Sequence, residues 1–250
     1  MISLPLAIII VSARLITMKK KTQLILLSGL LCDKALWTHQ LETLRDVADL
    51  TVADLTKDDN IKGMANRVLA NAPNLFSLAG LSMGGYVAQE IMRIAPERVE
   101  RLALLDTSAN ADTPDIKKKR LGFIAQLSIG EFRGITGKLL PYLIHSDRLN
   151  DETLVNTIKS SATNVGSVSF LRQQKAIMSR SDGMKDLKNI KCPTLVLCGR
   201  QDALTPLHWH EGIAQSIPNA NLVIIEDCGH LAPLERPHAV SAVMRYWLTN

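Results

Sequence analysis

The stretch "LFSLAGLSMGGY", residues Leu75 to Tyr86, decides the fold of this chain. Its first half is an apolar run typical of a buried strand, and a helical pattern follows that Pro96 ends. Gly80-Leu81-Ser82-Met83-Gly84 spans the junction and matches G-x-S-x-G. In that motif a tight turn holds a serine in a crowded backbone conformation, and the glycines let strand and helix approach closely. The stretch therefore predicts that Ser82 is a nucleophile. A phosphate-binding loop would need a different glycine pattern, which is not present.

Other short apolar runs alternate with helical patterns along the chain, which is typical of a parallel sheet with helices on both faces. Besides 75–80, the predicted strands are 23–29, 50–55, 100–108, 192–199 and 221–229, and helices are predicted at 62–71, after Ser82, and at 237–248. The fold class is therefore α/β, with a mostly parallel central sheet. Each strand run ends at Gly, Asp or Ser, so polar groups collect at the edge where parallel sheets place their sites.

The strand runs stop between Ala109 and about Asn189. Four segments there have helical patterns, at 116–127, 134–144, 151–162 and 169–178. We therefore expect residues 110–189 to form a helical cap inserted in a core of residues 18–109 and 190–250. Residues 1–17 are expected to be a dispensable arm or the product of an upstream start, because Met18 begins a more natural N-terminus.

Composition narrows the class of protein. The 250 residues are 46% hydrophobic and 21% charged, with a net charge of +5, which indicates a folded chain with a sizeable core. Aromatic residues make up 4%, too few for base-stacking platforms, and the basic runs 19–21 and 117–120 are expected to be solvated surface rather than a nucleic-acid site. The apolar run 4–11 is too short for stable membrane insertion. The four cysteines form no C-x-x-C pair, which favours a reduced, cytoplasmic protein.

A nucleophilic serine needs a base, and the base needs an orienting carboxylate. His230 follows the last apolar run and is the predicted base, whereas the other five histidines, His210 among them, suit surface positions better. Asp202 and Asp106 both follow strands and compete as the acid. The Asp-x-x-x-Pro turn favours Asp202, and Asp106 is expected to fix the start of the cap. Whether Asp106 can substitute for Asp202 stays open at this point.

The negative charge that develops on an attacked carbonyl needs hydrogen-bond donors. The backbone N–H of Met83, directly after the serine, is one, and the N–H of Leu30, in the loop after the first strand, is expected to be the other. Cys32 lies near that loop but lacks the elbow turn. The pair His208 and His210 has no third ligand at useful spacing, so no metal and no cofactor are expected.

Taken together, these motifs resemble the α/β-hydrolase superfamily, and more narrowly its compact, capped bacterial branch of esterases, lactonases and C–C hydrolases. The similar segments are "SGLLCDKALWTHQ", "LAGLSMGGYVAQEIM", "PTLVLCGRQDALTP" and "IEDCGHLAPLERP", so the resemblance runs from Thr22 to Asn250. It implies the α/β-hydrolase fold and a Ser-His-Asp triad. The oxyanion segment departs from the frequent His-Gly, because Ser28 stands before Gly29 here.

The resulting hypothesis is a serine hydrolase that cleaves an ester, thioester or lactone of a small to medium, mainly apolar molecule. The alternatives are a C–C hydrolase or lyase, a cofactor-free perhydrolase, and a small-molecule receptor with a vestigial triad. The expected partner is the small-molecule substrate, and the chain is expected to be a monomer or homodimer. Four apolar side chains are the expected substrate contacts: Trp37, Phe123, Leu140 and Leu143.

Overall fold

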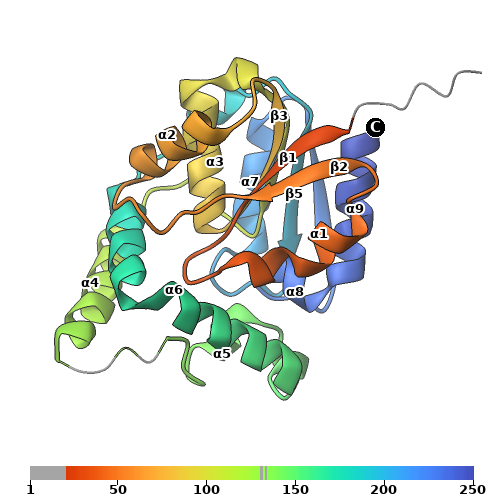
Figure 1. Cartoon of the computed structure of the whole chain (residues 1–250). Helices are drawn as coiled ribbons and strands as arrows, with labels where there is room; N and C mark the ends of the chain where they lie inside the picture. Colours follow the sequence, from red (N-terminus) through yellow and green to blue (C-terminus); the bar gives the residue numbers. More distant parts are fainter. Residues whose placement is uncertain (1–20, 130–131, 133) are drawn as a thin grey trace, which may run out of the picture.

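The computed structural model describes residues 21–129, 132 and 134–250, and these form a six-stranded sheet in which every neighbouring pair is parallel. The order across the sheet is β2-β1-β3-β4-β5-β6 (Figure 1). The strands are β1 Thr22–Leu27, β2 Ala48–Val52, β3 Phe76–Leu81, β4 Val99–Leu105, β5 Thr194–Gly199 and β6 Ala220–Ile225. The predicted α/β class is confirmed. The prediction for residues 1–17 lies outside the described residues.

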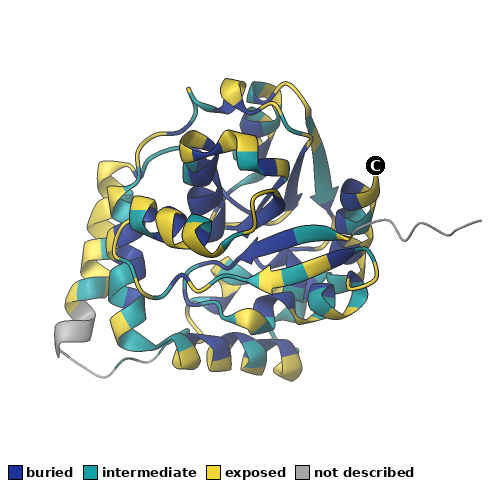
Figure 2. Cartoon of the chain, turned by 45° about the horizontal axis from the view of Figure 1, so that its top comes forward, coloured by how far each residue is buried: buried dark blue, intermediate teal, exposed yellow. Residues whose placement is uncertain are grey.

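Helices cover both faces of the sheet. On one face, side chains such as Leu78, Leu102 and Val196 pack against α2 (Ile61–Asn71), α3 (Met83–Ile94) and α7 (Leu207–Ser216). On the other face, the alternate residues of the same strands pack against α1 (Thr38–Thr43) and α9 (Pro237–Thr249). Because both faces are covered, all six residues of β3 are buried, and Figure 2 shows central strands in dark blue between helices that are partly exposed. This is why the strands read as continuous apolar runs.

The segment between β4 and β5 is helical, with α4 (Pro114–Ile129), α5 (Leu140–Leu143) and α6 (Glu152–Ser179). The two helices predicted at 151–162 and 169–178 are the two halves of α6, which is broken at Gly166 with φ 75° and ψ 172°. The helix predicted over 134–144 is wrong for most of its length. Gly134 has φ +56°, and α5 is a single turn that begins beside Pro141 and ends at Ile144, which is extended with φ −135° and ψ 158°.

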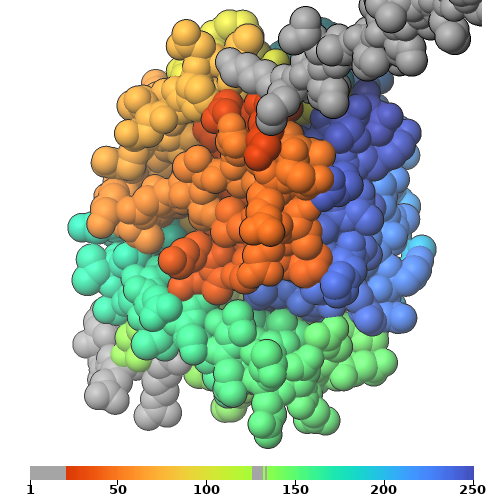
Figure 3. Space-filling model, turned by 45° about the vertical axis from the view of Figure 1, so that its right-hand side comes forward, coloured from red at the N-terminus to blue at the C-terminus, as the bar shows by residue number. Residues whose placement is uncertain are grey.

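The inserted helices lie beside the loops that follow β1 and β2. Arg172 of α6 donates to the carbonyl of Thr56, and α6 also bonds the loop after β1, as described below. Figure 3 shows these helices, in green and turquoise, closing one end of the molecule below the orange N-terminal part of the sheet domain. Within the described ranges, every helix is too short or too polar to span a bilayer.

The chain enters and leaves the insertion at one place. The N–H of Gly183 donates to the carbonyl of Ala109 at 2.7 Å. The buried carboxylate of Asp112 pairs with Arg120 of α4 at 2.7 Å and with Arg180, just after α6, at 2.8 Å. Arg180 also lies over the ring of Tyr86 on α3, with its guanidinium carbon 4.2 Å from the ring centroid. These contacts fix the two crossings to each other and to the helix that follows Ser82.

Candidate active site

Ser82 lies on the turn between β3 and α3, with φ 53° and ψ −116°. This is a left-handed conformation that costs a side-chain-bearing residue free energy, and the packing around it must hold it there. The neighbouring glycines make that packing possible. A Cβ on Gly80 would lie 2.4 Å from the carbonyl oxygen of Gly84, and a Cβ on Gly84 would lie 2.1 Å from that of Leu27. The turn is therefore possible only with glycine at these two positions.

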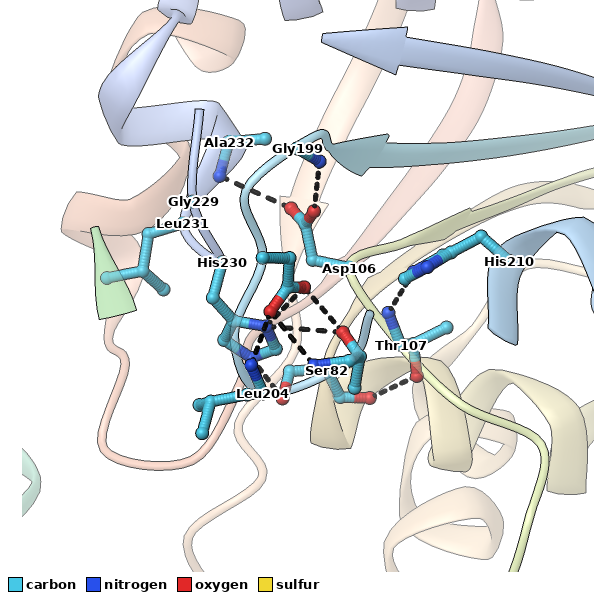
Figure 4. Close-up of polar contacts among 12 residues, drawn as sticks. Ser82, Asp106, Thr107, Gly199, Leu204, His210, Gly229, His230, Leu231 and Ala232 are labelled. Atoms are coloured by element: carbon cyan, nitrogen blue, oxygen red, sulfur yellow. Dashed lines mark hydrogen bonds and ion pairs between the residues drawn. The ribbon is translucent and has the colours of Figure 1, made fainter. Parts of the chain in front are cut away.

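Three of the predicted site residues come together at the carboxyl end of the sheet. His230 Nε2 lies 2.9 Å from Ser82 Oγ, and His230 Nδ1 lies 2.8 Å from Asp202 Oδ2 (Figure 4). His230 is 3% exposed and Asp202 4%, so bulk water competes little for these bonds. Burial raises the pKa of Asp202, but the charge and hydrogen bonds of His230 and the bonds from Thr205 outweigh it, and the net shift is downward. Asp202 is thus an anion that orients the imidazole.

The loop after β5 saturates the Asp202 carboxylate. Oδ1 accepts the N–H groups of Leu204 and Thr205 at 2.8 and 2.9 Å. Oδ2 accepts the hydroxyl of Thr205 at 2.5 Å in addition to His230. Thr205 was not among the predicted site residues, although an Asp-x-x-Thr sequence before a helix is the signal of such a turn. The carboxylate is held by four bonds and cannot rotate away from His230.

Asp106, the competing acid, does not contact His230. Its carboxylate accepts the N–H of Gly199 at 2.8 Å and the N–H of Ala232 at 3.3 Å (Figure 4). Burial and the nearby charge of Asp202 raise its pKa well above the ordinary value. Asp106 therefore connects the end of β5 to the histidine loop. The expectation that it fixes the start of the cap is wrong, because both of its oxygens face those two loops.

Buried His210 supports the Ser82 turn through Thr107. Thr107 Oγ1 donates to the carbonyl of Ser82 at 2.7 Å, and the N–H of Thr107 donates to His210 Nε2 at 2.9 Å (Figure 4). His210 is 0% exposed, so its expected surface position is wrong, since α7 turns the ring toward the sheet. Burial lowers its pKa to about 4, so the ring is neutral and accepts the bond. The sequence carried no signal for this contact, which joins residues 103 positions apart.

The loop after β1 lies against Ser82. A Cβ on Gly29 would be 3.3 Å from Ser82 Cβ, so Leu30 follows a residue in contact with the nucleophile. Met83 is the first residue of α3, and the first amides of a helix have no acceptor within it. Met83 therefore directly follows the nucleophile and Gly29, the neighbour of Leu30, lies against it, while the role of the two amides as oxyanion donors stays a prediction. Ser28, which stands where histidine is frequent, donates to the carbonyl of Asp33 at 3.3 Å and so fixes the loop internally.

A buried carboxylate holds the histidine loop. Glu235 is 1% exposed and accepts the N–H groups of Gly229 and Leu231, on either side of His230, at 2.9 and 3.3 Å. The N–H of His230 itself donates to the carbonyl of Leu143 at 3.0 Å. The inserted segment therefore supplies one of the bonds that position the base. Glu235 was not predicted as a site residue.

Of the four expected substrate contacts, Trp37 is wrongly assigned. It is 0% exposed and its indole N–H donates to Ser28 Oγ at 3.2 Å, so it supports the loop from the core. Leu140 is 6% exposed and packs in the core, whereas Leu143 is half-buried and contacts the histidine loop through its backbone. Phe123 is 41% exposed on α4. For these last three, contact with substrate remains a prediction.

Two cavities lie near this site without including Ser82 or His230. One, of about 310 Å³, is lined by Tyr86, Gln89, Ser108 and Arg180 with eight further residues, where the chain enters and leaves the insertion. The other, of about 420 Å³, is an open groove between Asp33 and α6. Both contain mostly polar or charged side chains.

The cysteines do not compete with Ser82 as nucleophiles. Burial, followed by the charge of Asp33, raises the pKa of Cys32 to about 12, so its thiol is protonated at neutral pH. Burial likewise raises the pKa of Cys198 to about 12. Among the side chains that the structure describes, no three His, Cys, Asp or Glu residues are placed to bind a metal ion.

The chain is similar to known proteins both in sequence and in fold. The model of the alpha/beta hydrolase family matches residues 33–243. A pimeloyl-[acyl-carrier protein] methyl ester esterase of Pectobacterium carotovorum is 30% identical over 232 residues, which is 87% of this chain and 91% of that protein. The solved structure of a thermophilic esterase from Thermogutta terrifontis superposes with a TM-score of 0.83 at 28% identity, covering 91% of this chain and 89% of that one. A Mycobacterium tuberculosis protein named "Putative non-heme bromoperoxidase BpoC" is 28% identical over 172 residues, 67% of this chain, but the match spans only 65% of its length.

Proposed function

Because the chain belongs to the α/β-hydrolase family, we propose that it is a serine hydrolase that cleaves a carboxylic ester, thioester or lactone of a small to medium, mainly apolar substrate. The observation that carries this proposal is the continuous chain from Asp202 through His230 to Ser82, with distances of 2.8 and 2.9 Å. Ser82 is held at φ 53° at the start of α3, which is the geometry of an activated serine.

Each residue has a defined task in this reaction. His230 Nε2 takes the hydroxyl proton as Ser82 Oγ attacks the carbonyl carbon, and Asp202 stabilises the imidazolium that forms. The amides of Leu30 and Met83 bind the oxyanion. His230 then protonates the leaving alcohol or thiol, which departs and leaves an acyl-enzyme; with a lactone it protonates the ring oxygen, which stays on the acyl chain as a hydroxyl. Water attacks the acyl-enzyme with His230 as base, and Ser82 recovers its proton.

Two further points support an ester with an apolar part. The Pectobacterium relative and the Thermogutta structure are both named as esterases, at 30% and 28% identity. Leu204, whose N–H bonds Asp202, is 43% exposed and presents an apolar side chain next to the acid loop. The substrate contacts proposed for Phe123 and Leu143 would extend this apolar surface from the inserted segment, which we propose acts as a cap domain.

A panel of p-nitrophenyl esters of rising acyl length, with lactones and thioesters beside them, tests the proposal. We expect turnover of short to medium esters that disappears in Ser82→Ala, while the circular dichroism spectrum and melting temperature stay those of the parent. Turnover that survives in Ser82→Ala would exclude the mechanism. Covalent labelling of Ser82 by a fluorophosphonate, without turnover of any ester, lactone or thioester of the panel, would instead favour a small-molecule receptor.

A further inference from the structure

The loop that carries Leu30 is a strained turn. The N–H of Cys32 donates to the carbonyl of Gly29 at 3.1 Å, which makes Leu30 and Leu31 the central residues. Leu31 has φ +60°, the conformation of the third residue of a type II turn, which glycine usually occupies. Because a trans peptide points its N–H opposite to its C=O, closing the turn through the Gly29 carbonyl directs the Leu30 N–H outward, away from the turn.

The turn keeps this strained form because the inserted helix α6 binds its central peptide. The side-chain oxygen of Gln173 accepts the Leu31 N–H at 3.1 Å, and the side-chain nitrogen donates to the carbonyl of Leu55 at 3.3 Å. Gln173 is 1% exposed and Leu31 4%, so water cannot replace the bond. In the ordinary type I turn the central peptide is rotated, and the Leu31 N–H would point away from Gln173 and be left without an acceptor.

Ser161, on the other half of α6, holds the end of the same turn. Its hydroxyl oxygen accepts the N–H of Asp33 at 2.7 Å and lies 2.9 Å from Asp33 Oδ1. Both halves of α6 reach the turn because the helix is broken at Gly166, whose φ of 75° and ψ of 172° are open to essentially no residue but glycine. The sheet fixes the start of this loop, and the bonds from α6 hold Leu31 and Asp33 in place.

We propose that Gln173 is a positioning residue that holds the turn against α6 and so fixes the place of the Leu30 amide beside Ser82. Without this buried acceptor the turn shifts to satisfy the Leu31 N–H, and the Leu30 amide moves with it. The inference rests on the proposed function, since it assumes that this amide binds the developing charge. It also means that the insertion takes part in transition-state stabilisation in addition to covering the site.

The test compares Gln173→Met with Gln174→Met. Methionine keeps the size of glutamine but has no strong acceptor. Gln174 is the matched control because it is also buried, at 3% exposed, and sits next to Gln173 on the same helix, but its oxygen accepts from Arg120 instead of the turn. Active sites are titrated with a fluorophosphonate, so that unfolded protein does not count toward kcat.

We expect Gln173→Met to lose about 10- to 100-fold in kcat per titrated site, part of the 10²- to 10³-fold cost of losing an oxyanion donor, with KM within about 3-fold. Inhibition by a trifluoromethyl ketone, whose adduct carries an oxyanion, should weaken by the same factor. Gln174→Met should stay within about 3-fold of the parent.

Equal kcat per site in the two methionine variants would overturn the inference, as would a loss of kcat with unchanged binding of the trifluoromethyl ketone. The proposed function fails separately: turnover that persists in Ser82→Ala rejects it whatever Gln173→Met does. Turnover that depends on Ser82 but is indifferent to Gln173 rejects only the positioning role.

Discussion

Replacing each of the two buried aspartates by asparagine separates the orienting acid from its neighbour. In Asp202→Asn, Oδ1 still accepts from Leu204 and Thr205, which fixes the new amide nitrogen at the position of Oδ2, 2.8 Å from His230 Nδ1. That amide nitrogen is a donor, so His230 must present Nδ1 as an acceptor. Nε2, 2.9 Å from Ser82 Oγ, then carries the proton and cannot act as a base.

The expected cost is about 10⁴-fold in kcat, or roughly 5.4 kcal/mol of transition-state stabilisation, because the wrong tautomer removes the base while leaving the fold in place. Asp106→Asn should keep kcat within about 10-fold, since Asp106 contacts the N–H groups of Gly199 and Ala232 and not His230. Its cost should appear in stability instead. One of those N–H groups will face an amide nitrogen, a loss of about 1–3 kcal/mol.

The assay is kcat on one p-nitrophenyl ester per titrated active site, together with urea unfolding of the parent and both variants. The reasoning is refuted if Asp106→Asn loses as much kcat as Asp202→Asn, or if Asp202→Asn retains more than about a tenth of the parent rate. Either result would contradict the division of roles between the two aspartates.

Three further changes test the packing around the site. Gly84→Ala places a Cβ 2.1 Å from a backbone oxygen of β1 and should lower the free energy of unfolding in urea by at least about 3 kcal/mol. Gly122→Ala on α4, whose Cβ would meet nothing within 4 Å, should leave it unchanged or raise it by up to about 1 kcal/mol. Similar values for both variants would contradict the close approach of β1 and α3. His210 has a folded pKa of about 4, below the ordinary 6.5, so its contribution is complete above pH 6.5 and is lost as pH falls toward 4, at up to about 1.4 kcal/mol per pH unit. His210→Gln, which does not titrate, should flatten the unfolding free energy between pH 6.5 and 4, and an unchanged slope would argue against a buried neutral ring. Asp112→Ala leaves Arg180, whose side chain is 8% exposed, without its carboxylate and should cost about 3–5 kcal/mol, while a melting temperature within 2 °C of the parent would show that the pair contributes little.

The sheet and the Ser82 turn could be predicted because their signals are local. A strand buried on both faces is a continuous apolar run, and the G-x-S-x-G sequence by itself indicates a strained turn at the serine. His230 and Asp202 could be placed because parallel strands bring their carboxyl ends to one edge, so three distant loops meet there. The Asp-x-x-x-Pro turn also pointed to the right aspartate for contact with His230.

The contacts around Ser82, His230 and Asp202 could not be predicted, because they depend on how the inserted helices pack against the sheet domain. Nothing in the sequence near Gln173 indicates that its oxygen meets Leu31, 142 residues away. Trp37 was predicted to contact substrate, whereas its indole fits the core and bonds Ser28. The helical pattern at 134–144 was misleading because local apolar spacing does not register the backbone of Gly134 at φ +56°.

The most direct test of the central claim is the site and stoichiometry of covalent labelling by a fluorophosphonate, measured by intact mass and peptide mapping while esterase activity is followed in the same sample. The account predicts one phosphonyl group per chain, located on Ser82, with activity lost in proportion to labelling. His230→Ala, which lacks the base, should be labelled much more slowly than the parent. Loss of activity with Ser82 unmodified, or full modification of Ser82 with activity intact, would contradict it.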